Sequence, residues 1–150
     1  MAYVSLDSDQ IKKAHKKHKY TKEQVLQLEQ CMDPKNGPLY FMKTFMKIQH
    51  PTKGEMPFKP FAYQERLIEA YNSHRFSISM LPRQTGKTTC ASGYLIWYAM
   101  FRPDSQILIA AHKYAGASDI MSRVRYAYEM LPSWIKAGVT QYNRNSIEFD

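Results

Sequence analysis

An apolar run, a short polar loop and a second apolar run follow one another between residues 76 and 100, and this order constrains the fold more than any other feature. Residues 76–81 predict a buried strand, and residues 88–100 predict a helix apolar enough to lie against a sheet. Residues 106–111 predict the next buried strand. We therefore expect a strand, crossover helix and strand unit, which should be parallel and right-handed.

The triplet Gly86-Lys87-Thr88 stands at the junction of loop and helix. A nucleotide phosphate chain at a helix N-terminus needs a glycine for close approach, a lysine for the β and γ phosphates, and a hydroxyl for Mg²⁺. The P-loop pattern G-x-x-x-x-G-K-[ST] places its first glycine at position 81, where this chain has Leu81. We interpret residues 81–88 as a deviant P-loop that binds ATP and Mg²⁺, with Thr88 at the metal. The alternative is a glycine turn that enters a helix with a solvent-facing lysine.

Arg83 lies inside this loop, four residues before Lys87. A planar, permanently charged guanidinium there can stabilise charge that develops on the γ-phosphate, so we predict Arg83 and Lys87 as catalytic residues. The alternative is a structural arginine that bonds loop carbonyls. The other loop positions predicted to bind the nucleotide are Gln84, Thr85, Gly86, Thr88 and Thr89. Gln84 and Thr85 mainly contribute backbone amides, and Thr89 is interpreted as a first-turn hydroxyl rather than a second metal ligand.

Tyr63 and Gln64 precede the predicted strand and open a helical pattern over residues 63–71. An aromatic ring can stack on adenine while a neighbouring primary amide bonds its edge through paired hydrogen bonds. We predict both residues as nucleotide-binding, with Gln64 as the adenine reader. The alternative for such a pair is an ordinary helix start.

The chain before residue 61 divides into two parts. Residues 1–20 form a basic arm, which is either a solvated or disordered tail or a nucleic-acid contact. Residues 21–60 form a helical lead-in, in which Thr21 and Gln24 match a capping box for a helix that ends near Met32. A second short helix is expected over residues 39–48 and an irregular hairpin over residues 48–60. The lysines of the arm and its edge are Lys12, Lys13, Lys16, Lys17, Lys19 and Lys22, with His15 and His18 between them.

After the second predicted strand, residues 115–131 show the spacing of a longer helix, and residues 139–142 and 146–149 are expected to pair as a hairpin. With 150 residues, 44% of them hydrophobic, the chain suits one domain. No apolar segment is long enough to suggest a membrane span or signal peptide, so we expect a soluble, intracellular protein. Cys31 and Cys90 indicate reduced thiols and no zinc site. The net charge of +8 favours a polyanionic partner.

Four segments carry a resemblance to a known family. They are Lys47-Ile48-Gln49-His50-Pro51 with Gly54, Phe58-Lys59-Pro60 with Tyr63-Gln64, Arg83-Gln84-Thr85-Gly86-Lys87-Thr88-Thr89, and Ile109-Ala110-Ala111-His112-Lys113, followed in family order by Leu131-Pro132, Asn143 and Ser146-Ile147-Glu148. Together they resemble the large terminase subunit of tailed bacteriophages, the ATP-driven motor that packages double-stranded DNA into a procapsid. The resemblance begins near Tyr40 and leaves the basic arm outside.

The resemblance implies an α/β fold of the P-loop NTPase class, with three layers and a mainly parallel sheet. Residues 61–150 would be the N-terminal part of that ATPase domain, with residues 21–60 as a short helical extension. It implies that Gln64 is the adenine motif, that residues 83–88 are the family's own deviant Walker A, and that its arginine acts in cis on the γ-phosphate. Residues 110–113 would couple nucleotide state to DNA, although a polar strand end that feeds a helix is the alternative for His112 and Lys113.

The family also implies partners and a place of action. The partners are double-stranded DNA, a portal protein and a small terminase subunit, and the complete motor would be a homo-oligomeric ring at the procapsid portal in the host cytoplasm. No membrane is involved. The acidic Walker B pair that activates water follows a later apolar strand in such motors, and Glu148 and Asp150 do not fit that pattern. We therefore expect this chain by itself to be an inactive ATPase. The alternatives are a superfamily 2 helicase-like fragment and a non-catalytic DNA-binding or packaging accessory module.

Overall fold

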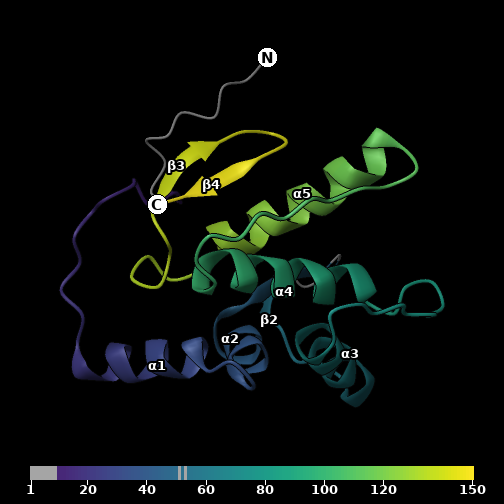
Figure 1. The fold of residues 1–150 in the computed structure, drawn as a ribbon, viewed down its shortest axis with the longest axis horizontal. Coiled ribbons are helices and arrows are strands. Elements are labelled where there is room, and N and C mark those ends of the chain that lie inside the picture. The colour runs from purple at the N-terminus through teal and green to yellow at the C-terminus, as the bar shows by residue number, and fades with distance from the viewer. Residues whose placement is uncertain (1–9, 51, 53) are drawn as a thin grey trace.

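A computed structural model describes residues 10–50, 52 and 54–150 of the chain. Helix α4 lies in the middle of the molecule, with α5 and the β3–β4 hairpin on one side and α1, α2 and α3 on the other (Figure 1). The elements are α1 (Lys22–Met32), α2 (Gly37–Phe45), β1 (Lys47–His50), β2 (Gly54–Pro57), α3 (Ala62–Ser73), α4 (Lys87–Phe101), α5 (Tyr114–Glu129), β3 (Val139–Tyr142) and β4 (Ile147–Phe149). In the described residues, no helix is long and apolar enough to cross a membrane.

Helix α1 begins where the capping box predicts it. The Gln24 backbone N–H donates to Thr21 Oγ1 at 3.2 Å, and the Thr21 N–H donates to Gln24 Oε1 at 3.0 Å. This reciprocal pair satisfies two backbone donors that a helix start leaves free. Helix α2 ends at Phe45, three residues before the predicted end at Ile48. The prediction was wrong there because residues 47–50 pair with β2 instead of continuing the helix.

The hydrophobic core forms around α4. Trp97 is fully buried and its indole Nε1 donates to the Cys31 carbonyl at 2.8 Å, which fixes α4 against the end of α1. Phe41 and Met42 of α2 and Ile68 of α3 are fully buried in the same core. Helix α2 therefore contributes its apolar side chains to the core around α4.

Both sheets are two-stranded antiparallel hairpins. In the first, Ile48 pairs with Met56, and in the second, Tyr142 pairs with Ile147, with an irregularity between Val139 and Gln141. The predicted hairpins at residues 48–60 and 139–149 are both confirmed as strand pairs. The predicted turn between β1 and β2 includes Pro51 and Lys53, which lie outside the described residues.

The predicted buried strands at residues 76–81 and 106–111 are wrong for the described structure, where neither segment joins a strand ladder. Ile78, Met80 and Leu108 are 95%, 93% and 90% exposed. Parallel strands are stable only when neighbouring strands and covering helices bury them on both faces. Among the described residues, no strand lies in a ladder beside either segment. The two small antiparallel sheets do not test the α/β P-loop class, which stays a prediction.

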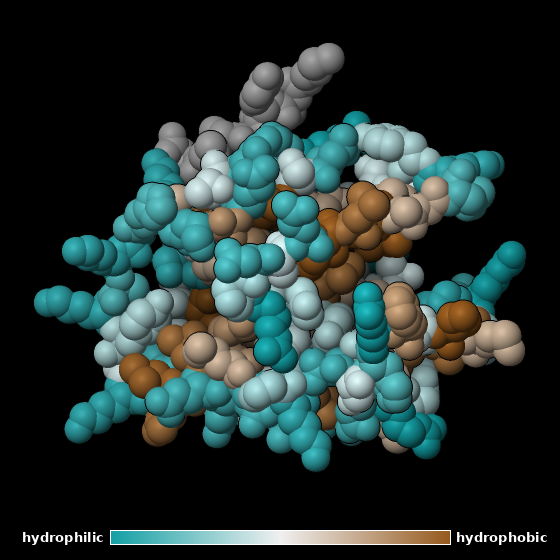
Figure 2. All heavy atoms as spheres, in the orientation of Figure 1, coloured by the Kyte–Doolittle hydropathy of each residue, from teal (hydrophilic) through white to brown (hydrophobic). Residues whose placement is uncertain are grey.

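The segment 107–109 borders an apolar cavity of about 340 Å³ between α4, α5 and β4. Leu95, Met121 and Phe149 line its other sides. Figure 2 shows an apolar patch in front of α5, where this segment crosses the helix. The segment predicted as the second strand thus lies beside an apolar helix surface, but in the described part of the chain it forms no sheet that covers the cavity next to it.

Candidate functional site

The loop before α4 turns sharply because two residues adopt left-handed backbone conformations. Gln84 has φ 63° and Gly86 has φ 74°, and Gly86 is the residue at the helix N-cap. The Cys90 N–H donates to the Gly86 carbonyl at 2.9 Å, which closes the first turn of α4. Thr85 Oγ1 donates to the Pro82 carbonyl at 3.1 Å and closes the loop from inside. The predicted junction of loop and helix at Gly86-Lys87 is therefore confirmed.

The N-terminus of α4 offers an anion-binding position. The first backbone N–H groups of a helix have no intrahelical acceptor, and the aligned peptide dipoles place partial positive charge there. In α4 these groups belong to Lys87, Thr88 and Thr89, since Cys90 donates the first intrahelical bond. A phosphate group is the ligand that this arrangement suits.

The Lys87 ammonium lies over its own loop. Nζ donates to the Pro82 carbonyl at 3.2 Å and to the Leu81 carbonyl at 3.4 Å, and the side chain is exposed. These are neutral acceptors at the long end of the hydrogen-bond range, whereas a phosphate oxygen would give a shorter, charge-assisted bond. The lysine is exposed, as the glycine-turn alternative expected, and its ammonium folds back over the carbonyls of the loop.

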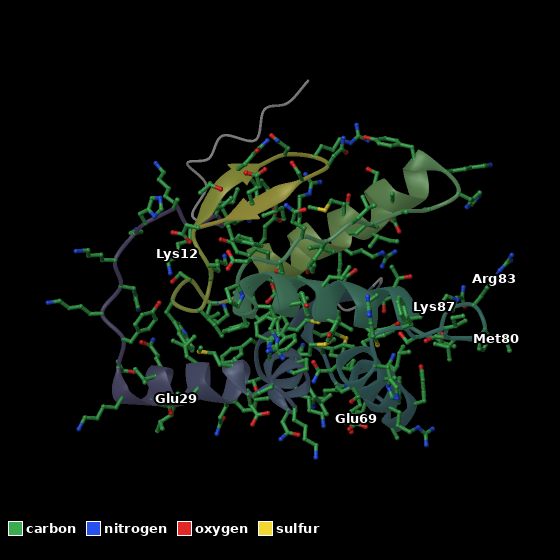
Figure 3. All side chains as sticks on the ribbon, in the orientation of Figure 1. Lys12, Glu29, Glu69, Met80, Arg83 and Lys87 are labelled. Carbon is green, nitrogen blue, oxygen red and sulfur yellow. The ribbon has the colours of Figure 1, made fainter. Side chains whose placement is uncertain are left out.

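Arg83 lies at the outer edge of the loop and extends away from Lys87 into solvent (Figure 3). Within the described residues its guanidinium makes no hydrogen bond or ion pair, so the alternative of a structural arginine that bonds loop carbonyls does not hold here. Its exposed side chain is unobstructed by a partner. The structure therefore brings Arg83 to the loop but not to the helix N-terminus.

Tyr63 and Gln64 of α3 lie against the same loop. The Tyr63 hydroxyl donates to the Thr85 carbonyl at 2.8 Å, and Gln64 Nε2 donates to the same oxygen at 3.0 Å. Gln64 is 6% exposed, and its Oε1 accepts from the Phe61 N–H at 2.9 Å. Both ends of the amide are thus bonded within the protein. The predicted adenine reader lies at the site, and in this structure it holds the loop.

Gly86 contacts Gln64 closely enough to exclude a side chain. A Cβ at position 86 would lie 2.6 Å from Gln64 Nε2. Both the left-handed φ and this contact therefore require glycine. The glycine of the Gly-Lys-Thr triplet therefore serves the packing of the loop on α3, and its role in the approach of a phosphate stays a prediction.

Phe61 is an aromatic residue of the site that the sequence reasoning missed. Its ring stacks on Tyr63 with centroids 5.9 Å apart and an interplanar angle of 8°, and it is 66% exposed. An aromatic residue two positions before Tyr63 was the available signal. Together Phe61 and Tyr63 give the site a flat aromatic surface of the kind that a base can stack on.

Thr88 and Thr89 both lie in the first turn of α4 and are half-buried. Thr89 faces a groove of about 300 Å³ between α4, α5 and β1, next to the buried Ser92. This placement agrees with the interpretation of Thr89 as a helix hydroxyl rather than a metal ligand. The described residues contain no cluster of three or more His, Cys, Asp or Glu side chains, so a Mg²⁺ here would rely on Thr88 and the phosphates.

Glu148 and Asp150, the acidic residues that do not fit the Walker B pattern, lie far from this loop. Asp150 Oδ2 accepts from the His15 N–H at 2.5 Å, and this backbone bond is the main cause that lowers the pKa of Asp150. Glu148 pairs with Gln141 in the β3–β4 hairpin. In Figure 1 that hairpin and the C-terminus lie on the far side of α4 from the loop before α4. The structure gives neither carboxylate access to a phosphate at Lys87.

Lys113 and His112 are exposed and precede α5, with Lys113 at its N-cap. The Lys113 carbonyl accepts from the Gly116 N–H at 3.0 Å. This matches the alternative of a polar segment that feeds a helix, and the coupling role implied by the resemblance stays a prediction.

The sequence from residue 78 to residue 150 matches a protein-family model described as "Terminase large subunit, T4likevirus-type, N-terminal". The match covers the loop, α4, α5 and the β3–β4 hairpin, while Tyr63 and Gln64 lie before it. It confirms the resemblance drawn from the sequence motifs.

Proposed function

We propose that the chain is the ATP-binding part of a phage DNA-packaging motor, because residues 78–150 match the family model of the T4-like large terminase subunit. The substrate would be ATP, bound at residues 81–88. The fold would be part of an α/β P-loop domain. ATP hydrolysis in the complete motor would drive double-stranded DNA into a procapsid.

The single observation that carries this proposal is the position of Lys87. Lys87 is the first residue of α4, and its ammonium bonds the Pro82 carbonyl of the loop that turns at Gln84 and Gly86. On nucleotide binding, Lys87 would leave the carbonyls of Leu81 and Pro82 for β- and γ-phosphate oxygens. The Thr88 hydroxyl would hold Mg²⁺, which supplies charge neutralisation at the phosphates.

Arg83 would act on the γ-phosphate after its side chain turns back toward the loop. Because the guanidinium has no protein partner among the described residues, this rotation breaks no hydrogen bond or ion pair. Phe61 and Tyr63 would stack on adenine. Gln64 could bond the adenine edge only if its amide broke the hydrogen bond to the Thr85 carbonyl or to the Phe61 N–H. Base binding and the position of the loop would therefore be linked through one amide.

We expect ATP binding without steady turnover by these 150 residues. Within the described structure, no carboxylate is placed to activate a water at Lys87. The portal protein, the small terminase subunit and a homo-oligomeric ring are the family's packaging partners, and we propose them for this chain, acting in the host cytoplasm. The second candidate, a non-catalytic DNA-binding module, is favoured by the exposed lysines near the N-terminus.

Titration with a fluorescent ATP analogue and Mg²⁺ tests the proposal. Lys87→Ala should raise the Kd at least about tenfold, because a charge-assisted contact to phosphate contributes roughly 1.5–3 kcal/mol. Lys35→Ala is the matched control, since Lys35 is an exposed lysine in the α1–α2 turn and should bind like the unmodified chain. Equal binding by Lys87→Ala, with DNA binding retained, would favour the second candidate.

A further inference from the structure

The segment before α1 is held to the body of the protein at residues 11–13. Ile11 is 7% exposed, and the Val139 N–H donates to the Lys12 carbonyl at 2.9 Å in a parallel bridge between Lys13 and Val139. Lys12 Nζ donates to the Lys136 carbonyl at 2.8 Å. The part of the predicted arm that follows residues 11–13 is thus attached to the body of the protein at its start. Residues 1–9 lie outside the described residues.

A buried lysine strengthens this attachment. Lys136 is 4% exposed, and its Nζ donates to the carbonyls of Gln10 at 2.7 Å and Glu129 at 2.8 Å. The same ammonium lies 5.5 Å from the centroid of the Tyr128 ring. Burying an ammonium without hydrogen-bond acceptors costs free energy. Because the Gln10 carbonyl is one of the acceptors of Lys136, this cost favours the observed position of the arm.

The other end of the segment is fixed by α1. Thr21 caps that helix through the two bonds with Gln24. Between the two attachments, residues 15–22, here called the basic strap, follow the outer edge of the molecule from the β3–β4 side to α1 (Figure 1). Residues 16–20 have no regular secondary structure.

The lysines of the basic strap carry a concentrated positive charge. Its four lysines are exposed and form no salt bridge with a carboxylate of the described residues; they are Lys16, Lys17, Lys19 and Lys22. Figure 3 shows side chains with nitrogen tips that project outward along this edge, and Figure 2 shows the same edge as hydrophilic. The lysines are available to an external polyanion.

The strap and the nucleotide loop lie at opposite ends of the molecule. In Figure 3, Lys12, which precedes the strap, is at one end, and Lys87 and Arg83 are at the other. A ligand of the strap would therefore not compete with ATP for the same lysines. An extended chain spans at most about 3.3–3.6 Å per residue, so the seven positions from Lys16 to Lys22 reach several phosphates of a duplex.

We propose that the basic strap binds the phosphate backbone of double-stranded DNA. The choice of DNA as the polyanion rests on the proposed packaging function, while the strap itself rests on its charge, exposure and two attachments. Because both ends are already fixed, the strap loses less conformational freedom on binding than a free tail would. The contact should be independent of DNA sequence, since phosphates carry none of the base pattern.

Fluorescence anisotropy with a labelled 20-base-pair duplex, repeated over a series of salt concentrations, tests this proposal. The test variant combines Lys16→Gln, Lys17→Gln, Lys19→Gln and Lys22→Gln. The matched control removes the same four charges from exposed positions elsewhere through Lys35→Gln, Arg66→Gln, Arg75→Gln and Arg144→Gln. Circular dichroism and ATP-analogue binding confirm that both variants are folded.

We expect the strap variant to bind the duplex at least about tenfold more weakly near 0.1 M salt. Its slope of log K against log salt should fall by about 3 to 4, because each phosphate contact contributes about 0.9 to the slope. The control should keep most of the affinity and slope of the unmodified chain. Equal losses in both variants would overturn the proposal in favour of bulk charge, and so would absence of duplex binding by the unmodified chain. Either result leaves ATP binding through Lys87 intact as a separate conclusion.

Discussion

Gln64 of α3 donates from Nε2 to the carbonyl of Thr85 at 3.0 Å and so fixes the loop before α4 to a helix twenty-one residues earlier in the chain. The same amide accepts the Phe61 N–H, which starts α3. One buried side chain therefore bonds both the start of α3 and the loop. This bond makes Gln64 a structural determinant of the site even before any nucleotide is considered.

Replacing Gln64 with glutamate should destabilise the protein by about 1–3 kcal/mol, the usual cost of an unsatisfied buried polar group. The carboxylate can still accept from Phe61 but cannot donate to Thr85, and it would face that carbonyl at close range. Urea denaturation measures the loss, and the ATP-analogue Kd should rise with it. Gln30→Glu, on the exposed surface of α1, is the control and should change stability by less than about 0.5 kcal/mol. Equal stability of Gln64→Glu and the control would show that the bond to Thr85 contributes nothing.

Alanine at Gly86 should destabilise the protein more than alanine at Gly54. Both glycines have a left-handed φ, 74° and 69°, so both substitutions carry the same backbone strain of about 1–2 kcal/mol. Only at Gly86 would the new Cβ also meet another group, Gln64 Nε2 at 2.6 Å, whereas the surroundings of Gly54 are open. Thermal melts of the two variants should therefore show the lower Tm for Gly86→Ala. Identical Tm values would mean that Gln64 moves away without cost.

Truncation of Ile78 should have little effect on stability, and truncation of Ile68 a large one. Ile78 is 95% exposed in the segment that the sequence predicts as a buried strand, while Ile68 of α3 is fully buried. Ile68→Ala should cost about 2–5 kcal/mol, because it removes a core side chain and leaves a cavity. Ile78→Ala should stay within about 0.5 kcal/mol in urea denaturation. A large loss for Ile78→Ala would show that residues 76–81 are buried in solution after all.

The two cysteines should be inert to thiol reagents in the native protein at pH 8. Burial raises the pKa of Cys31 to about 12 and that of Cys90 to about 11, so neither side chain is a thiolate there. A disulfide reagent should report no free thiol until urea is added and two thiols per chain afterwards.

The same pKa shifts predict the direction of the pH dependence. Because both folded pKa values lie above the unfolded one, the neutral buried thiols contribute their full stability below about pH 8.5. That contribution decreases as the pH rises toward 11. The urea midpoint of unfolding should therefore decrease as the pH rises through this range. The decrease should be smaller in Cys90→Ala. Rapid labelling of either cysteine in the native state at pH 8 would contradict the burial.

The local helix signals in the sequence were reliable where they depended on neighbouring residues. The capping box of Thr21 and Gln24 and the glycine before Lys87 each predicted a helix start that the structure has. Each of these signals depends only on the dihedral angles and hydrogen bonds of residues at most four positions apart in the chain. The hairpin of β3 and β4 was predicted for the same reason, since its strands are separated by a few residues only.

The predictions that failed depended on distant partners. Residues 76–81 and 106–111 have the composition of buried strands, but a strand needs a neighbour to accept its backbone bonds, and the described chain provides none. The double use of the Gln64 amide was also invisible, because its acceptor Thr85 comes close only when α3 packs beside the loop. The attachment of Lys12 to Val139 and Lys136 joins residues more than 120 positions apart.

The sequence by itself determined the Gly86-Lys87-Thr88 triplet, the helix that follows it and the match of residues 78–150 to the terminase family model. These properties follow from contiguous residues and their allowed backbone conformations. Only the tertiary structure decided that Gln64 holds the loop, that Arg83 faces solvent and that the basic strap is fixed at both ends. Each of these depends on which distant surfaces pack together, and that choice is made by the burial of the α4 core rather than by any local pattern.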